Sequence, residues 1–215
     1  DTAYGSDELA VPANSVLTPD QHQYSKDAPG YKQDLETAKK LAKSSGLEGK
    51  TLTYIYNADR ANMEAVATVI QQQLSQIGVK LSIEGLDSPT FFSRFFAVGM
   101  GTGLENTYDL GSNGWDSERG SAYQAHFYLN HGLAEKNAWG WSKEISEKVI
   151  KADATADEAE AQELWNEIQE EYVEEYWEFP LTYTNFVMVS QKNVTGLDGS
   201  EVVPELVDWM SIKVD

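Results

Sequence analysis

Cysteine is absent from this chain of 215 residues, and histidine occurs only three times. Without cysteine there is no disulfide, no thiolate nucleophile and no Cys-ligated metal centre. His126 and His131 are five residues apart, a spacing that neither places both rings on one helical face nor matches common zinc motifs. We therefore expect no metal site and no cofactor. The lack of cysteine selects no compartment, because exported proteins can lack it too.

Positive charge is also scarce. There are 16 Lys and Arg residues against 35 Asp and Glu residues, so the formal net charge is −19 at pH 7. Such a chain repels the phosphate backbone of nucleic acids and disfavours an anionic membrane surface, and we expect no nucleic acid as a partner. Residues 157–178 alone hold ten acids and no Lys or Arg. This concentration is typical of a solvated helix face; an acidic binding surface is the alternative.

Long apolar runs are missing as well. No segment approaches the roughly 18 apolar residues of a membrane-spanning helix, and Asp1-Thr2-Ala3 lacks the basic and then apolar pattern of a secretion signal. We expect a truncated start and either an intracellular chain or one whose leader has been removed. With 41% hydrophobic residues, the length suits one domain or a domain with an appendage.

The order of periodic segments predicts an α/β fold. Three of the six prolines fall in residues 1–30, which predicts a loop-rich leading segment. In chain order the pattern then predicts a helix over 31–45, a strand over 51–56, a helix over 63–77 capped by Asn57 and Asp59, a strand over 79–83, a helix with Ser88 as its N-cap, and a strand over 108–113. The first strand, helix and strand form a βαβ unit, so these two strands should be parallel.

The second half of the chain predicts two helices and further strands. Ser142 should cap the first helix, and the acidic segment should form a longer one that continues to Pro180, with Tyr176 on its apolar face. Glutamates four residues apart repel each other by about 0.2–0.5 kcal/mol per pair, so tertiary packing must hold this helix. Strands are expected over 181–184 and 186–190.

The candidate site follows the end of the strand over 108–113, where an aromatic ring stands beside carboxylates. Trp115 and Glu118 are the first candidates for ligand contact. The second group consists of Asp116, Asn113 and Tyr123, and Trp139 and Trp141 are candidates for lining the pocket. A carboxylate beside a ring at a strand's carboxyl end suits a cation and an apolar side chain.

Two alternatives accompany this site. Flat rings beside polar groups hold flexible solutes such as peptides or oligosaccharides, although core packing explains most aromatic residues. Asp116 and Glu118 also supply the two carboxylates that glycoside hydrolysis needs, but neighbouring acids are common in so acidic a chain.

Several stretches, in this order, resemble the carboxy-terminal lobe of the solute-binding proteins of peptide-transporting ABC importers, the oligopeptide- and dipeptide-binding family. They are the helix opening at 31–42, the strand at 49–56, the crossover at 67–83, the strand from Tyr108 to Trp115, Phe179-Pro180-Leu181 and Val194-Thr195-Gly196. The resemblance implies a periplasmic-binding-protein-like lobe with a central mixed sheet, parallel in its βαβ part and flanked by helices. Residues 31–200 would form the carboxy-terminal ligand-binding lobe, and residues 201–215 would return towards a missing amino-terminal lobe.

The family's function is also implied by this resemblance. Its members capture a solute, most often a short peptide, between two lobes outside the cell membrane and deliver it to ABC permease subunits, without catalysing a reaction. The expected location is the extracellular face, with a lipid anchor, or the periplasm. In the family an Asp three residues after the Trp pairs with the peptide's α-ammonium group; Glu118 occupies that position here. Some relatives carry oligosaccharides or nickel complexes instead, so an oligosaccharide ligand stays open.

Overall fold

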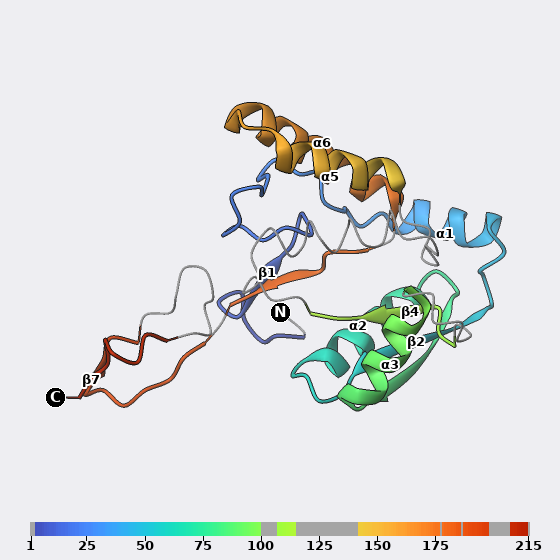
Figure 1. The fold of residues 1–215 in the computed structure, drawn as a ribbon. Coiled ribbons are helices and arrows are strands. Elements are labelled where there is room, and N and C mark those ends of the chain that lie inside the picture. The colour runs from blue at the N-terminus through green and yellow to red at the C-terminus, as the bar shows by residue number, and fades with distance from the viewer. Residues whose placement is uncertain are drawn as a thin grey trace. The chain divides into compact units, whose positions relative to one another are not determined.

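The computed structural model describes residues 3–99, 107–114, 142–176, 178–185, 187–197 and 207–214. The chain divides into two compact units (Figure 1). The first, the sheet unit, is built mainly on Lys32–Gly114, and the second, the helix-pair unit, on Ser6–Tyr31 and Gly140–Asp215. None of the helices in these described ranges combines the length and apolar character needed to cross a membrane.

A parallel sheet forms the centre of the sheet unit. Strand β2 (Thr51–Asn57) lies between β3 (Lys80–Leu86) and β4 (Leu110–Ser112), and both neighbours pair with it in parallel. Helix α2 (Met63–Ser75) connects β2 to β3. The predicted βαβ unit is therefore confirmed, and so is the prediction that the strand over 108–113 joins the same sheet.

Side chains that alternate along β2 bury the two faces of this sheet. Tyr54 and Tyr56 pack with Ala67 of α2 and Leu81 of β3 in one apolar cluster. The intervening Ile55 is fully buried on the other face. There the α3 helix (Ser88–Gly99) contacts β2, and its Phe91 is also fully buried. The sheet thus has helices on both faces, as the α/β prediction requires.

Helix α1 (Leu35–Ser44) precedes the sheet, and its ends follow the sequence signals. Asp34 adopts an extended backbone, and its side chain accepts a hydrogen bond from Thr37 N at 3.0 Å. This bond and one from the Thr37 hydroxyl lower the pKa of Asp34. Gly46 then follows the helix with a φ of +74°, a conformation that glycine adopts without strain.

The helix-pair unit is organised by α5 (Lys143–Ala154) and α6 (Glu158–Glu175), which lie side by side (Figure 1). Ser142 caps α5 as predicted, because its hydroxyl accepts a bond from Ile145 N. Lys148 of α5 forms ion pairs with both Glu167 and Glu171 of α6. One cation thus offsets a like-charge pair that the sequence predicts to be repulsive, and the two carboxylates raise the pKa of Lys148.

The leading segment packs on α6 through a buried carboxamide. Gln169 Oε1 accepts hydrogen bonds from Ser15 Oγ at 2.7 Å and from Ser25 N at 3.1 Å, and Gln169 Nε2 donates to Gln23 O at 3.0 Å. The segment also contains a strand that was not predicted. This β1 strand (Ala10–Pro12) pairs antiparallel with β5 (Thr182–Thr184). Two short strands, β6 (Val194–Thr195) and β7 (Lys213–Val214), form a second antiparallel pair.

Two predicted helix starts are wrong in their caps. Helix α2 begins after Asn62, which has a left-handed backbone and makes no side-chain cap bond, so Asn57 and Asp59 do not cap it. At α3 the cap bond comes from Asp87, whose side chain accepts from Thr90 N at 2.8 Å. Ser88 is instead the first residue of that helix, and its hydroxyl bonds to a strand residue.

Two predictions near the carboxyl end are also wrong. Helix α6 ends at Glu175, before Pro180, because Tyr176 takes a left-handed conformation with a φ of +58°. Tyr176 therefore leaves the apolar face, and 70% of its surface is exposed. In the last turn of α6, the carbonyl of Val173 accepts a hydrogen bond from the Tyr31 hydroxyl at 2.8 Å. Residues 187–190 form no strand, so the second strand prediction fails.

Candidate functional site

The carboxyl ends of the three parallel strands meet at one edge of the sheet unit. Asn57 at the end of β2 pairs in register with Leu86 at the end of β3, and Tyr56 pairs with Ser112 at the end of β4. Open parallel sheets bind their ligands outside the carboxyl ends of the strands. This carboxyl edge is therefore the candidate site, and it includes the strand tip identified from the sequence.

A buried asparagine organises this carboxyl edge. Asn57 is completely inaccessible to solvent, and its carboxamide exchanges hydrogen bonds of 3.0 and 3.1 Å with the Ser88 hydroxyl. Asn57 Oδ1 also accepts from Asp59 N at 3.0 Å, and Asp59 Oδ2 accepts from Ser88 N at 2.7 Å. These bonds join the turn after β2 to the start of α3. Asn57 and Asp59 therefore make this connection and do not form the predicted cap of α2.

Arg60 joins this turn to the end of β4. Its Nη1 donates to the Gly114 carbonyl at 2.8 Å, and its Cζ lies 6.0 Å from the centre of the Phe92 ring, within the range of a cation–π contact. A Cβ at position 114 would lie 2.9 Å from Arg60 Nη1. Glycine at this position therefore allows the guanidinium to reach the carbonyl that immediately precedes Trp115 in the sequence.

The predicted site residues are described only in part. Asn113 lies at the carboxyl edge, directly after β4, and its Oδ1 atom is buried with no hydrogen-bond partner in the described part of the chain. The other six candidates lie outside the described residues: Trp115, Asp116, Glu118, Tyr123, Trp139 and Trp141. The carboxylate pair considered for glycoside hydrolysis is among these six.

Titration and metal binding offer no second chemistry in the described residues. The pKa of Asp87 is lowered because the Thr90 hydroxyl and amide donate to its carboxylate, as expected for a helix cap. Burial raises the pKa of Tyr54. Across the described ranges, no group of three or more His, Asp or Glu side chains is placed to hold a metal ion.

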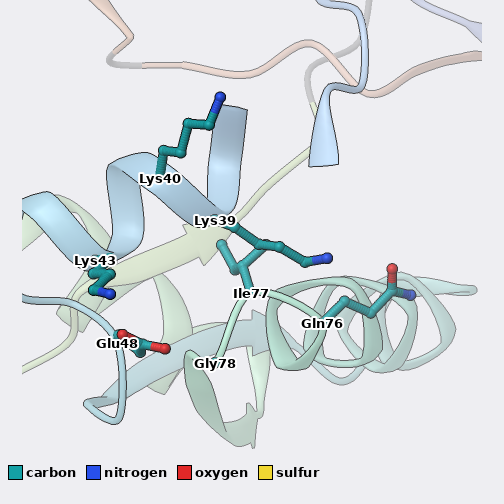
Figure 2. A pocket seen from close by; sticks show the side chains of 7 residues that line it. All are labelled: Lys39, Lys40, Lys43, Glu48, Gln76, Ile77 and Gly78. Carbon is teal, nitrogen blue, oxygen red and sulfur yellow. The ribbon is translucent and has the colours of Figure 1, made fainter. Parts of the chain in front are cut away.

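A lysine-rich pocket lies at the opposite edge of the sheet. It encloses about 320 Å³ and is lined by Lys39, Lys40, Lys43, Glu48, Gln76, Ile77 and Gly78 (Figure 2). Figure 2 shows Lys39 extending across Ile77 towards Gln76, while Lys40 points away from them. Gly78 precedes β3 in sequence, so this lysine pocket adjoins the amino ends of the strands. Its position therefore differs from the usual ligand edge of an α/β sheet.

Sequence reasoning did not identify the two residues that shape the carboxyl edge. It assigns Asn57 to a helix cap and gives Arg60 no role. The available signal is position: Asn57, Asp59 and Arg60 follow directly on a predicted strand, where a parallel sheet places its functional loops. Their partners Ser88 and Gly114 are 31 and 54 residues away in sequence, so only the fold reveals the contacts.

Comparison with known proteins identifies the family. Residues 3–138, more than half of the chain, match the family described as bacterial extracellular solute-binding proteins, family 5 Middle. The chain belongs to family 5 of the bacterial extracellular solute-binding proteins. The family identified from the sequence and its α/β lobe are thus confirmed.

Family 5 relatives are much longer than this chain. The glutathione-binding protein GsiB of Salmonella typhimurium is 26% identical over 196 residues, which are 87% of this chain but 37% of GsiB. Among solved structures, the ABC transporter substrate-binding protein CtaP of Listeria monocytogenes is 27% identical with a TM-score of 0.78, and the match covers all of this chain and 43% of CtaP. DppA of Helicobacter pylori, solved in complex with the peptide STSA, has a TM-score of 0.75 at 20% identity, covering 97% of this chain and 40% of DppA, which supports the fold alone.

Proposed function

We propose that this chain is the carboxy-terminal lobe of the solute-binding component of an ABC importer, and that the whole protein captures short peptides between two lobes. Closure of the lobes around a hinge would present the peptide to the permease subunits. The observation that carries this proposal is the family 5 match over residues 3–138. The peptide as ligand is supported by a relative that is named for glutathione, itself a short peptide. No catalysed reaction is part of the proposal.

The carboxyl edge supplies the ligand-facing rim in this proposal. Trp115 and Glu118 make the main contacts, because an aromatic face suits a peptide side chain and a carboxylate suits the α-ammonium group. Asp116, Asn113 and Tyr123 contribute further polar contacts, and Trp139 and Trp141 line the pocket. The hydrogen bond from Arg60 to the Gly114 carbonyl supports this assignment, because it fixes the backbone directly before Trp115, where the proposed rim segment begins in the sequence.

The second lobe is supplied by another part of the same protein. This chain spans about 40% of the length of the relatives it matches, so half of a two-lobed site lies elsewhere. We assign the ligand-binding lobe to residues 31–200 and the segment that returns to the first lobe to residues 201–215. Exposed apolar side chains in that segment support this: Trp209, Met210 and Val214 are 78%, 92% and 71% exposed. Exposed apolar side chains that gather in one short segment are typical of a surface that packs against another domain.

The proposed location is outside the cell membrane, either lipid-anchored at the extracellular face or in the periplasm. The family's description as extracellular supports the coarser assignment. Globomycin treatment of the native host would separate the two cases, because it blocks maturation of lipid-anchored precursors. Accumulation of a precursor indicates an anchor; unchanged processing indicates a periplasmic protein.

Calorimetry of the intact two-lobed protein against peptide and oligosaccharide libraries tests the function. We expect at least one short peptide to bind, and blocking its amino terminus to weaken binding. Binding of sugars but of no peptide would favour the oligosaccharide alternative, and binding of neither would reject the proposal. The isolated lobe should fold but bind the same peptide far more weakly, because it carries half of the site. Tight binding by the lobe alone would contradict the two-lobe arrangement.

A further inference from the structure

Strand β4 ends in a hydrogen-bond acceptor that the surrounding protein does not satisfy. Asn113 Oδ1 is shielded from solvent, yet no donor reaches it from the described residues. A carboxamide oxygen loses its hydration when it is buried, and native structures leave few such oxygens without a donor. An unsatisfied acceptor at the ligand edge of a parallel sheet is therefore a candidate for recognition of an incoming donor.

The polar groups on either side of Asn113 are already engaged. The Ser112 hydroxyl donates to Met63 Sδ at 3.7 Å, and the Gly114 carbonyl accepts from Arg60 Nη1 at 2.8 Å. Although Arg60 bonds to the adjacent residue, it makes no hydrogen bond to Asn113 Oδ1. The neighbouring groups on both sides are thus held in place, while the shielded acceptor between them stays unpaired, so that a donor from a ligand would meet an acceptor in a fixed position.

The position of Asn113 distinguishes it from other buried polar atoms that lack a partner. In the described chain these atoms belong to Thr18, Gln21, Gln23, Tyr54 and Asn113. The first three fall in the leading segment of the helix-pair unit, and Tyr54 lies in the middle of β2 against the α2 cluster. Of these five residues, only Asn113 follows the carboxyl end of a parallel strand. Ordered water can satisfy an interior atom, whereas an acceptor at this edge can also meet a ligand.

We propose that Asn113 determines specificity by accepting a hydrogen bond from an N–H group of the bound solute. This inference rests on the proposed function and adds a chemical requirement to it: the solute must present a nitrogen-bound proton at the tip of β4, as a peptide does. The carboxamide is uncharged, so an amide N–H serves as well as an ammonium group. Sites that hydrogen-bond a ligand group reject analogues that lack it, because the buried partner is then left unpaired.

Leucine at position 113 separates this role from a structural one. Leucine has the branched shape and the number of heavy atoms of asparagine, and it removes the unsatisfied acceptor together with the amide N–H₂ group without adding a polar group. If Asn113 Oδ1 serves to bind the ligand, Asn113→Leu leaves the unliganded protein as stable as before, or more stable, and weakens ligand binding. If Oδ1 instead holds the fold together, the same change lowers stability. Asn113→Asp keeps an acceptor at the same place and should preserve binding.

The test uses the full-length two-lobed protein, with glutathione and the tetrapeptide Ser-Thr-Ser-Ala as probes in calorimetry and thermal unfolding of the unliganded protein. We expect Asn113→Leu to weaken the binding of a probe that the natural protein binds by about tenfold, with an unchanged or higher Tm. Asn113→Asp should bind within about threefold of the natural protein. Retention of the natural affinity by the leucine variant would overturn the proposal.

Asn166 provides the matched control. Its Oδ1 already accepts a bond from Gln162 Nε2 at 3.0 Å on α6, so Asn166→Leu should lower the Tm or leave it unchanged and should not alter the affinity for the probe. If neither probe binds the natural protein, the result counts against short peptides as the ligand in the proposed function. Asn113 is then judged by Tm alone: a lower Tm for Asn113→Leu than for Asn166→Leu would overturn the inference, and an unchanged or higher Tm would support it.

Discussion

The two edges of the parallel sheet handle polar side chains in opposite ways. At the carboxyl edge, Asn57 is fully buried, Asp59 accepts a hydrogen bond from the start of α3, and Arg60 donates one to the residue after Asn113. The fold therefore sets the positions of these side chains. At the amino edge, Lys39 and Lys43 extend from α1 around the lysine pocket (Figure 2). The amino edge carries more charged side chains, whereas the side chains of the carboxyl edge are held in fixed positions by hydrogen bonds. Specific recognition depends on fixed geometry, because ordering flexible side chains opposes binding.

A similar contrast exists between two arginines that hold the ends of β4. Arg94 binds the amino end: its side chain donates to Thr107 Oγ1 at 3.1 Å and forms an ion pair with Glu84 at 2.8 Å. Arg60 binds the carboxyl end through the Gly114 carbonyl. Both bonds position the same strand, but only Arg60 adjoins the proposed rim. Substitutions of the two residues can therefore separate strand stability from ligand binding.

The largest effect is expected from the apolar layer behind the carboxyl edge. Phe91 is fully buried at the start of α3 and contacts the rings of Phe92 and Phe95. Phe91→Ala should lower the free energy of unfolding by about 3–5 kcal/mol through lost burial and a cavity, as measured by urea denaturation. The comparison substitution Ile77→Ala, in the partly exposed lysine pocket, should cost about 1 kcal/mol. Equal losses would mean that the two edges are supported equally.

The polar network of the carboxyl edge gives the next effect. Asn57→Ala removes the partner of the Ser88 hydroxyl and of Asp59 N in a site without solvent, so it should lower the free energy of unfolding by about 2 kcal/mol. Gln76→Ala, at the exposed amino edge, should change it by less than about 0.5 kcal/mol. Urea denaturation of both variants makes the comparison. A loss below about 0.5 kcal/mol for Asn57→Ala would show that water replaces the network at little cost.

The paired arginines test whether the edge acts on the ligand. Arg60→Met and Arg94→Met should each lower stability by about 1–2 kcal/mol, because each removes a charge-assisted hydrogen bond. Only Arg60→Met should also weaken peptide binding by the full-length protein, by roughly three- to tenfold, since it releases the carbonyl before the rim segment. Calorimetry and urea denaturation give the two readouts. Equal weakening by both variants would point to strand stability alone.

The fold was more predictable from sequence than the contacts at the site. Hydrophobic periodicity located β2, α2 and β3, because one amphipathic helix between two apolar strands has few ways to bury its surface. Helix caps were less predictable: Asp87 and Ser88 both suit an N-cap, and the choice depended on Asn57, which binds Ser88 from a different strand. The end of α6 before Pro180 depended likewise on the left-handed Tyr176. The choice of cap at α3 was thus decided by a tertiary contact, and the end of α6 by a left-handed residue, neither of which a hydrophobic pattern contains.

The smallest effect is expected at the lysine pocket. Lys39 is already paired with Glu36 at 3.2 Å and is 46% exposed in its side chain, and exposed ion pairs contribute little to stability. The double substitution Lys39→Gln and Lys43→Gln should therefore change peptide affinity by less than about twofold at physiological salt, because charges beyond a Debye length of about 8 Å are screened. Calorimetry of the full-length protein at low and physiological salt measures this. A larger loss at both salt concentrations would place the lysine pocket in the binding site and reverse the ranking of the two edges.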